Sequence, residues 1–150
     1  MFKHILVPTD GSALSEQTVA RAVLFAKECG SRVTFFYAQP AFELPFSGEG
    51  ALIILFNPDF PDRYAKAAEE KADYILKCAR TMAESAGVIA DTDTIVSALP
   101  YKAIIESAEQ RGCDLIIMAS HGRHGVAGLL LGSETQKVLI HSKIPVLVNR

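Results

Sequence analysis

The sequence from Asp114 to Ser133 reads Asp-Leu-Ile-Ile-Met-Ala-Ser-His-Gly-Arg-His-Gly-Val-Ala-Gly-Leu-Leu-Leu-Gly-Ser. Its apolar run, Leu115 to Ala119, is short and β-branched enough to predict a strand buried on both faces, as parallel sheets require. A glycine loop follows, and Gly132-Ser133 then opens another predicted helix. Because loop N–H groups and the positive end of a helix converge on one place, the stretch predicts an anion site, with phosphate as its natural ligand.

Two common phosphate loops are excluded by the glycine spacing. The chain contains no Gly-x-x-x-x-Gly-Lys-Ser/Thr motif. The glycines also do not fit Gly-x-Gly-x-x-Gly followed by an acidic residue about twenty positions later. The sequence therefore has neither a P-loop nor a dinucleotide-binding motif.

The composition restricts the class of protein. A chain of 150 residues fits one domain over residues 1–150, and an apolar fraction of 49% argues against disorder. No apolar run is long enough for a membrane span, and no signal peptide is recognisable, so we expect a soluble cytoplasmic protein. The net charge of −2, without a basic stripe, argues against nucleic acid as a partner.

The three cysteines point to neither a disulfide framework nor a zinc site. They are Cys29, Cys78 and Cys113, an odd number without a Cys-x-x-Cys pair. We expect them to be reduced, semi-buried thiols.

The first forty residues predict a β-α-β unit. A buried strand from Phe2 to Pro8 precedes the turn Thr9-Asp10-Gly11-Ser12, which is rich in helix-capping residues. Apolar residues at helical spacing then run from about Ser15 to Gly30, and a second strand covers Arg32 to Ala38. Asp10 therefore lies at the carboxyl end of the first strand.

The stretch of about residues 39–61 interrupts this pattern as an insertion containing proline and glycine. Its run Ala51 to Phe56 is too apolar for an ordinary solvated loop. Two interpretations stay open: a flap that packs on its own domain or on a partner subunit, and a mobile lid over a ligand.

The remaining elements continue the alternation of helices and strands. A long helix from Pro61 to Gly87 carries a face of mostly small residues suited to packing on a sheet. That face consists of Ala65, Ala68, Ala72, Ile75, Ala79 and Met82. An edge-type strand follows at Val88 to Val96, with Asp91 and Asp93 expected to point outward. The last elements are a helix from Pro100 to Gly112, a helix from Ser133 to about Ser142, and a strand at Ile144 to Val148. Ser133-Glu-Thr-Gln136 reads as a capping box for the last helix.

Five strands alternating with four helices predict a single-domain α/β fold with a mostly parallel sheet. Ligands of such sheets bind beyond the carboxyl ends of the strands, where the strand order reverses. Asp10 and the glycine loop both follow strand carboxyl ends, but the sequence alone does not give the strand order.

Several motifs resemble those of the universal stress protein family, and together they span nearly the whole chain. The family's nucleotide loop, Gly-x-x-Gly, nine residues, then Gly-Ser/Thr, corresponds to Ala119 to Gly122 followed by Gly132-Ser133, with Ala119 in place of the first glycine. Alanine still allows close approach of phosphate unless the position needs a positive φ. The other matching segments are Val7 to Ser12, Gly112 to Gly122 and Ile144 to Val148.

The resemblance implies a three-layer, adenine nucleotide alpha hydrolase-like sandwich with strand order 3-2-1-4-5. Strands one and four would then be neighbours, and Asp10 would face the glycine loop. In ATP-binding members, the positions of Asp10, Ala38 and Gly132 hold ribose, adenine and phosphate respectively. The full set of expected cofactor-binding residues is Pro8, Asp10, Ala38, Met118, Ala119, Gly122, Arg123, Gly132 and Ser133. Asp10 has an alternative role as the cap of the first helix.

The resemblance favours a stress-response or regulatory module that binds ATP, for which a magnesium ion arriving with ATP would need few protein ligands. We expect no catalytic or metal-ligating residues, and slow turnover at most, because Arg123 is the one cation in the motif and lacks an evident base. His121 and His124 flank it without completing a ligand set. The last strand, Ile144 to Val148, is expected to pair in a homodimer, as it commonly does in the family.

Three alternatives remain open. The chain could be a dimeric interaction protein of the same family that no longer binds nucleotide, which Ala119 would favour. It could be a weak ATPase or phosphotransferase that depends on His121 or Arg123. A flavodoxin-like electron carrier has a similar layout, and fold analogy alone does not choose among these.

Overall fold

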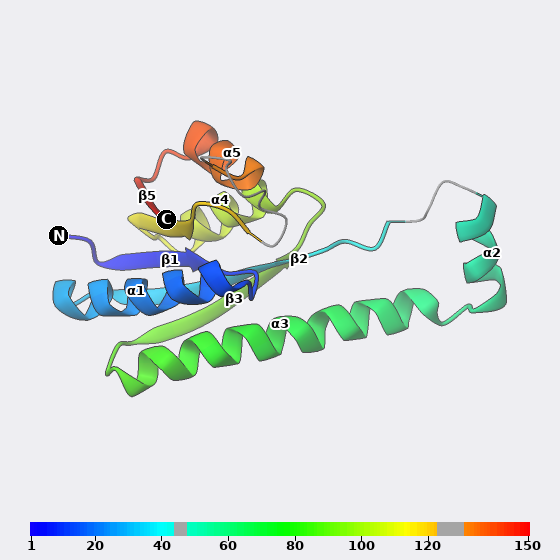
Figure 1. Ribbon diagram of the computed structural model, residues 1–150, viewed down its shortest axis with the longest axis horizontal. Helices are drawn as coiled ribbons and strands as arrows, with labels where there is room; N and C mark the ends of the chain where they lie inside the picture. The colour runs from blue at the N-terminus through cyan, green and yellow to red at the C-terminus, as the bar shows by residue number, and fades with distance from the viewer. Residues whose placement is uncertain (44–47, 123–130) are drawn as a thin grey trace.

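The computed structural model describes residues 1–43, 48–122 and 131–150, without the side chains of residues 49 and 51. Its core is a parallel five-stranded sheet in the order β3-β2-β1-β4-β5, with helices on both faces (Figure 1). The elements in chain order are β1 His4–Pro8, α1 Ala13–Cys29, β2 Arg32–Gln39, α2 Gly48–Phe56, α3 Phe60–Ser85, β3 Ala90–Val96, α4 Pro100–Gln110, β4 Leu115–Ala119, α5 Ser133–His141 and β5 Val146–Asn149. The α/β class and the strand order agree with the sequence-based prediction.

The central strand β1 separates two hydrophobic clusters. Ile5 and Val7 point to the face covered by α1 and α3, whereas Leu6 points to the face covered by α4 and α5. All three side chains are fully buried, because β1 has a strand on each side and helices on both faces. β1 and β4 are neighbours, so the segments that follow them start from the same edge of the sheet.

The helix ends explain how the chain enters and leaves this sheet. Ser12 caps α1 by accepting the Ser15 N–H through its side chain at 3.3 Å, and Gly30 ends the helix with a φ of 68°. The predicted capping box of α5 is wrong. Gly132 is the N-cap without a side-chain cap, Ser133 is already helical, and the Gln136 side chain donates instead to the carbonyl of Leu131 at 3.0 Å.

The helix α3 extends well beyond the sheet. Its buried residues are Ala72, Leu76, Ala79 and Ala83, so burial begins only near the middle of the helix. The predicted packing face is therefore only partly right, since Ala65 and Met82 are exposed. Figure 1 shows the reason: the first half of α3 continues past the carboxyl ends of the strands and has no sheet beneath it.

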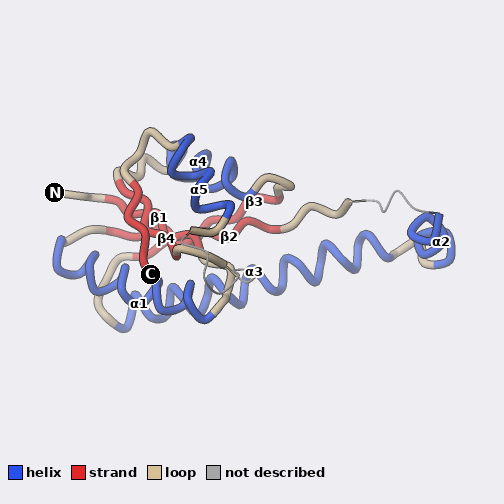
Figure 2. Tube along the Cα trace, turned by 45° about the horizontal axis from the view of Figure 1, so that its top comes forward, coloured by secondary structure: helices blue, strands red, loops and turns tan. Residues whose placement is uncertain are grey.

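The predicted insertion contains a further helix, α2, which the sequence pattern did not predict. α2 lies across the far end of α3, away from the sheet, in both views of the trace (Figures 1 and 2). Its run Leu52 to Phe56 thus covers neither the sheet of this chain nor the strand ends. Residues 44–47 lie outside the described part.

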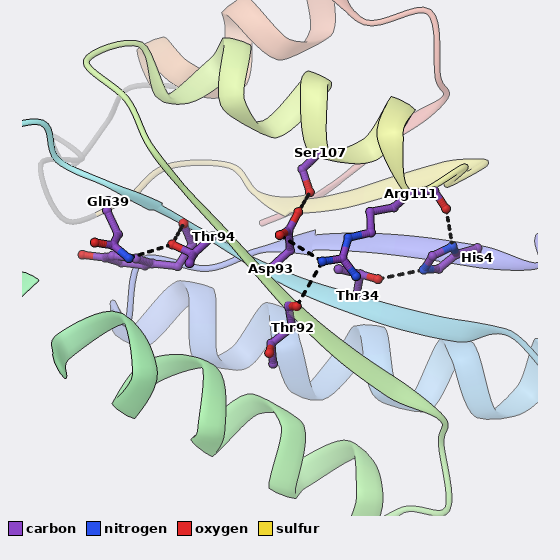
Figure 3. A network of polar contacts seen from close by, with 9 residues as sticks. His4, Thr34, Gln39, Thr92, Asp93, Thr94, Ser107 and Arg111 are labelled. Atoms are coloured by element: carbon purple, nitrogen blue, oxygen red, sulfur yellow. Dashed lines mark hydrogen bonds and ion pairs between the residues drawn. The ribbon is translucent and has the colours of Figure 1, made fainter. Parts of the chain in front are cut away.

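A polar network connects the edge strand β3 to α4 (Figure 3). Asp93 pairs with Arg111 at 3.0 Å and accepts the Ser107 hydroxyl at 2.6 Å. The expectation that Asp93 points outward is therefore wrong, because α4 covers this face of β3. Asp91 is exposed, as expected.

The cysteines differ from one another in exposure. Cys29 and Cys78 are exposed, contrary to the expectation of semi-buried thiols, whereas Cys113 is buried. All three are free thiols. Burial raises the pKa of Cys113 to about 11, so its thiol stays protonated and unreactive at neutral pH.

Candidate functional site

A cavity of about 450 Å³ opens at the carboxyl ends of β1, β2 and β4. The two helical layers form its sides, with α1 and α3 on one face and α4 and α5 on the other. Its lining residues are Pro8, Thr9, Asp10, Ser15, Phe36, Tyr37, Ala38, Pro40, Lys71, Pro100, Ile104, Met118, Ala119, His121, Gly122, Gly132, Ser133, Glu134 and Thr135. The structure thus brings together every expected cofactor-binding residue except Arg123, which lies outside the described residues.

Asp10 reaches the cavity through the turn that leaves β1. Gly11 has a φ of 73°, which favours glycine, and it redirects the chain from β1 into α1. The Asp10 carboxylate accepts the Ser12 N–H at 2.9 Å. Because Ser12 is the N-cap of α1, the alternative role of Asp10 as that cap does not apply.

Gly122 lies directly against Asp10. A Cβ at position 122 would collide with Oδ2 of Asp10, and it would lie 3.5 Å from Asp10 Cγ. Glycine therefore leaves room for a carboxylate from the neighbouring strand end. The expected juxtaposition of Asp10 with the residue after β4 is present.

The start of α5 forms another wall of the cavity. The Gly132 N–H donates to the Ser120 carbonyl at 2.7 Å, which holds the helix start against the end of β4. A Cβ at Gly132 would lie 3.1 Å from His121 Cα, so the approach is close. Since Gly132 provides no side-chain cap, Ser133 and the first turn present their N–H groups and the positive helix end toward this side of the cavity.

Ala119 occupies an ordinary backbone conformation. No residue other than glycine has a positive φ in the described part of the chain, and Ala119 ends β4 with an exposed fraction of 8%. The backbone at this position therefore does not require glycine. Thr135 donates its hydroxyl to the Ala119 carbonyl at 3.0 Å and fixes α5 to the end of the strand.

Comparisons with known proteins agree with this architecture. The model of the universal stress protein family matches residues 1–150. The chain belongs to the universal stress protein family. The universal stress protein MJ0531 of Methanocaldococcus jannaschii is 32% identical, over 99% of this chain and 82% of the relative.

Two solved structures extend the similarity to the whole universal stress protein fold. MJ0577 of Methanocaldococcus jannaschii has a TM-score of 0.80 at 28% identity, over 99% of this chain and 95% of that chain. A universal stress protein in complex with cAMP has a TM-score of 0.70 at 28% identity, over 99% of this chain and 97% of that chain. That related protein was therefore solved with an adenine nucleotide bound.

Some lining residues of this universal stress protein were not found from the sequence. Lys71 comes from α3 and Glu134 from α5. Lys71 belongs to a helix whose path beside the cavity depends on the fold, so no local signal marks it. Glu134 does stand next to the motif residue Ser133, and this adjacency could have indicated it.

Glu134 joins the two helices on one side of the cavity. Its carboxylate accepts the Tyr101 N–H at 2.8 Å and the Lys137 ammonium at 2.8 Å. The pKa of Lys137 is raised by its hydrogen bond to Glu134 and by the charge of that carboxylate. Tyr101 lies in the first turn of α4, so Glu134 supplies the acceptor that the N-cap Leu99 does not provide.

His121 also lines the cavity and contacts the Ser120 hydroxyl through Nδ1 at 3.1 Å. The described residues contain no cluster of three or more His, Cys, Asp or Glu side chains suited to a metal ion. None of the described helices is long and apolar enough to cross a membrane. His124 lies outside the described residues.

Proposed function

We propose that this universal stress protein binds ATP in the cavity and acts as a stress-response or regulatory module with slow or no hydrolysis. The observation that carries the proposal is the placement of the Asp10 carboxylate, Gly122 and the start of α5 around one cavity. A carboxylate that accepts hydroxyl protons suits a ribose, and a glycine-lined helix start suits phosphates. The site thus offers chemistry for both parts of a nucleotide.

The shape and lining of the cavity support a nucleotide rather than an inorganic anion. Its volume is in the range of small-molecule sites, which is about 300–1,000 Å³. Its wall between β2 and α4 is mostly apolar, with Phe36, Pro40, Pro100 and Ile104. An aromatic base fits this wall, with Ala38 as the proposed adenine contact. The related protein solved with cAMP supports an adenine base.

The proposed orientation of ATP follows from the positions of the residues that suit its ribose and its phosphates. Asp10 would hold the ribose, with Pro8, Met118 and Ala119 beneath the nucleoside. Gly122, Gly132 and Ser133 would hold the phosphates, with Arg123 as a further proposed contact. A magnesium ion arriving with ATP would take its ligands from the phosphates and water and would need few from the protein.

Slow or absent hydrolysis follows from the lining. Fast phosphoryl transfer needs positive charge at the γ-phosphate and a group that positions the nucleophile. Among the described lining residues, Lys71 is the only cation, and it lies across the cavity from α5. Glu134 is occupied by Tyr101 and Lys137, so it is a poor candidate for a base.

The first experiment is to denature freshly purified protein, identify any released nucleotide by chromatography, and titrate the stripped protein with ATP. We expect retained adenine nucleotide or rebinding at micromolar concentration. Gly132→Val is the matched variant, because a branched side chain would press on His121 and enter the phosphate wall. It should bind ATP more weakly with an unchanged circular dichroism spectrum. A protein that contains no nucleotide and is indifferent to ATP would favour the dimeric interaction protein instead.

We further propose that β5 mediates homodimer formation through the segment Ile144 to Val148. β5 is an edge strand of four residues that, among the described residues, pairs only with β4. Leu147 exposes 41% of its surface there. Pairing with a second copy would cover this side chain and complete the hydrogen bonding of the edge.

A further inference from the structure

The segment from Gly48 to Glu70, which comprises α2 and the first three turns of α3, projects from the domain as an arm (Figure 1). Its tip is apolar and exposed. Leu55 exposes 71% of its surface and Phe56 exposes 76%. Within the chain, α2 contacts α3. Phe42, which precedes α2 in the sequence, meets Phe60 at the start of α3 edge to face at a centroid distance of 6.0 Å.

Such a tip is costly in water. Leaving apolar side chains in contact with water costs free energy. Large contiguous patches of exposed apolar side chains usually mark an interaction surface. A helix of nine residues is too short to be stable alone, and its contact with α3 leaves Leu55 and Phe56 exposed. The arm therefore needs a partner surface.

The charges at the start of α3 indicate which partner fits. Asp59, Asp62, Arg63 and Lys66 are spaced by three, four and seven residues, so they follow one face of the helix. All four are exposed, and none forms an ion pair within the described part of the chain. Along this charge stripe, the two acidic residues, Asp59 and Asp62, precede the two basic residues in the sequence.

This order is complementary to itself in the antiparallel direction. If a two-fold axis passes between Asp62 and Arg63, Asp59 faces Lys66 of the second copy. Asp62 then faces Arg63 of the second copy. A parallel arrangement would place like charges together. Surface pairs of this type contribute little affinity, but they select partner and orientation.

We propose that the arm is a homotypic interface in which the arms of two copies pair antiparallel. The charge stripe sets the register, and the exposed apolar face of each α2 packs on the other copy's α3. A membrane fits less well, because the arm has more acidic than basic residues, whereas surface-binding helices are rich in lysine and arginine.

Charge reversal tests the proposal in the full chain. Variant one carries Asp59→Lys and Asp62→Lys, and variant two carries Arg63→Glu and Lys66→Glu. Each should weaken self-association measured by sedimentation equilibrium by about a hundredfold, since every pair becomes repulsive. An equimolar mixture should restore the association, because each positive stripe then meets a negative one.

Control variants separate this interface from other effects. Asp73→Lys changes an exposed residue later on α3 and should leave the mass unchanged. Leu55→Ser with Phe56→Ser should weaken association without rescue by either charge variant. Circular dichroism confirms folding of each protein, and all should bind ATP like the parent chain, so failure of the nucleotide proposal remains distinguishable.

Three results would overturn the arm proposal. One is a monomeric parent protein at high micromolar concentration. Another is an assembly whose mass is the same in both charge variants, or one that the mixture does not restore. The last is cosedimentation of the monomeric chain with phosphatidylglycerol vesicles, which would assign the apolar tip to a lipid surface.

Discussion

Asp10 and Gly122 form a coupled pair at the mouth of the cavity. They come from segments that follow β1 and β4, more than one hundred residues apart, and they meet because those strands are neighbours. The carboxylate occupies the space that a Cβ at position 122 would need. A side chain introduced at position 122 should therefore change ligand binding mainly by displacing the Asp10 carboxylate.

Asp10→Ala should weaken ATP, AMP and adenosine alike, by about ten- to a hundredfold, since a hydrogen bond to a charged group contributes about 1.5–3 kcal/mol. Gly122→Ala should weaken all three by displacing the carboxylate. The double variant should be no weaker than Asp10→Ala alone, because the two changes remove one interaction. Isothermal titration of the stripped proteins measures the affinities.

Gly48→Ala is the matched control, since a Cβ there meets nothing within 4 Å. It should leave all three affinities unchanged. A loss confined to ATP in Asp10→Ala would place the carboxylate at the phosphate end instead. Additive losses in the double variant would show that Gly122 acts independently of Asp10.

Among the elements, β5 has an open edge with a defined hydrogen-bonding pattern. The Pro145 carbonyl accepts the N–H of Ile116 in β4 at 2.9 Å, and the Asn149 carbonyl accepts the N–H of Ser120, directly after β4, at 2.7 Å. Because alternate residues of a strand direct their backbone groups to opposite sides, Val146 and Val148 present theirs to the open edge. These two residues would make the bonds of the proposed strand-paired dimer.

Val148→Pro should abolish the assembly step that depends on β5, because proline removes an N–H from the open edge without touching the bonds to β4. Val96→Pro is the matched control on the opposite edge strand, β3, where Val96 exposes 62% of its surface. Sedimentation equilibrium measures both. An unchanged mass for Val148→Pro, with the fold intact, would contradict pairing through β5.

At the scale of elements, the sequence predicts best where the signal is local. The apolar run Leu115 to Ala119 coincides with β4, and Gly30 ends α1 as expected. The last helix was predicted from Ser133, but its cap is Gly132, since the loop conformation rather than the hydroxyl determines that start. The helix α2 was missed because its apolar residues show no helical periodicity.

At the scale of the whole molecule, His4 links two strands to the end of α4 (Figure 3). His4 is 4% exposed, its Nδ1 donates to the Arg111 carbonyl at 3.1 Å, and its Nε2 accepts the Thr34 hydroxyl at 2.8 Å. Burial lowers the pKa of His4, and the nearby charge of Arg32 lowers it further. Asp114, Asp91 and the Arg111 carbonyl act in the opposite direction without reversing the shift.

The free energy of unfolding should therefore fall as the pH decreases below about 6.5, because the unfolded chain binds a proton more readily than the folded one. The stabilisation that comes from neutral, buried His4 is complete above the pKa that His4 has in the unfolded chain. It is lost as the pH falls through the lower pKa that His4 has in the folded protein. Urea denaturation between pH 7.5 and pH 5 measures it. His4→Gln should lower stability by about 1–2 kcal/mol at pH 7.5 and flatten the pH dependence.

The exposed His141 provides the comparison for this experiment. His141→Gln should keep the pH dependence of the parent protein. An equally steep pH dependence in His4→Gln would assign the effect to groups other than His4; Asp114 is not one of them, because its lowered pKa keeps it ionised in the folded and the unfolded chain between pH 7.5 and pH 5. The pKa of that carboxylate is lowered by the N–H groups of Lys3 and His4, which outweigh its desolvation.

The sequence by itself determined the strands, most helices, and the positions of Asp10 and the glycines after strand ends, because these features depend on local periodicity and backbone preference. The family resemblance added the strand order. Only the tertiary structure decided that Lys71 and Glu134 reach the same cavity and that Asp93 faces α4. It also decided where α3 leaves the sheet, because burial depends on the extent of the neighbouring layer and not on the helix's own pattern.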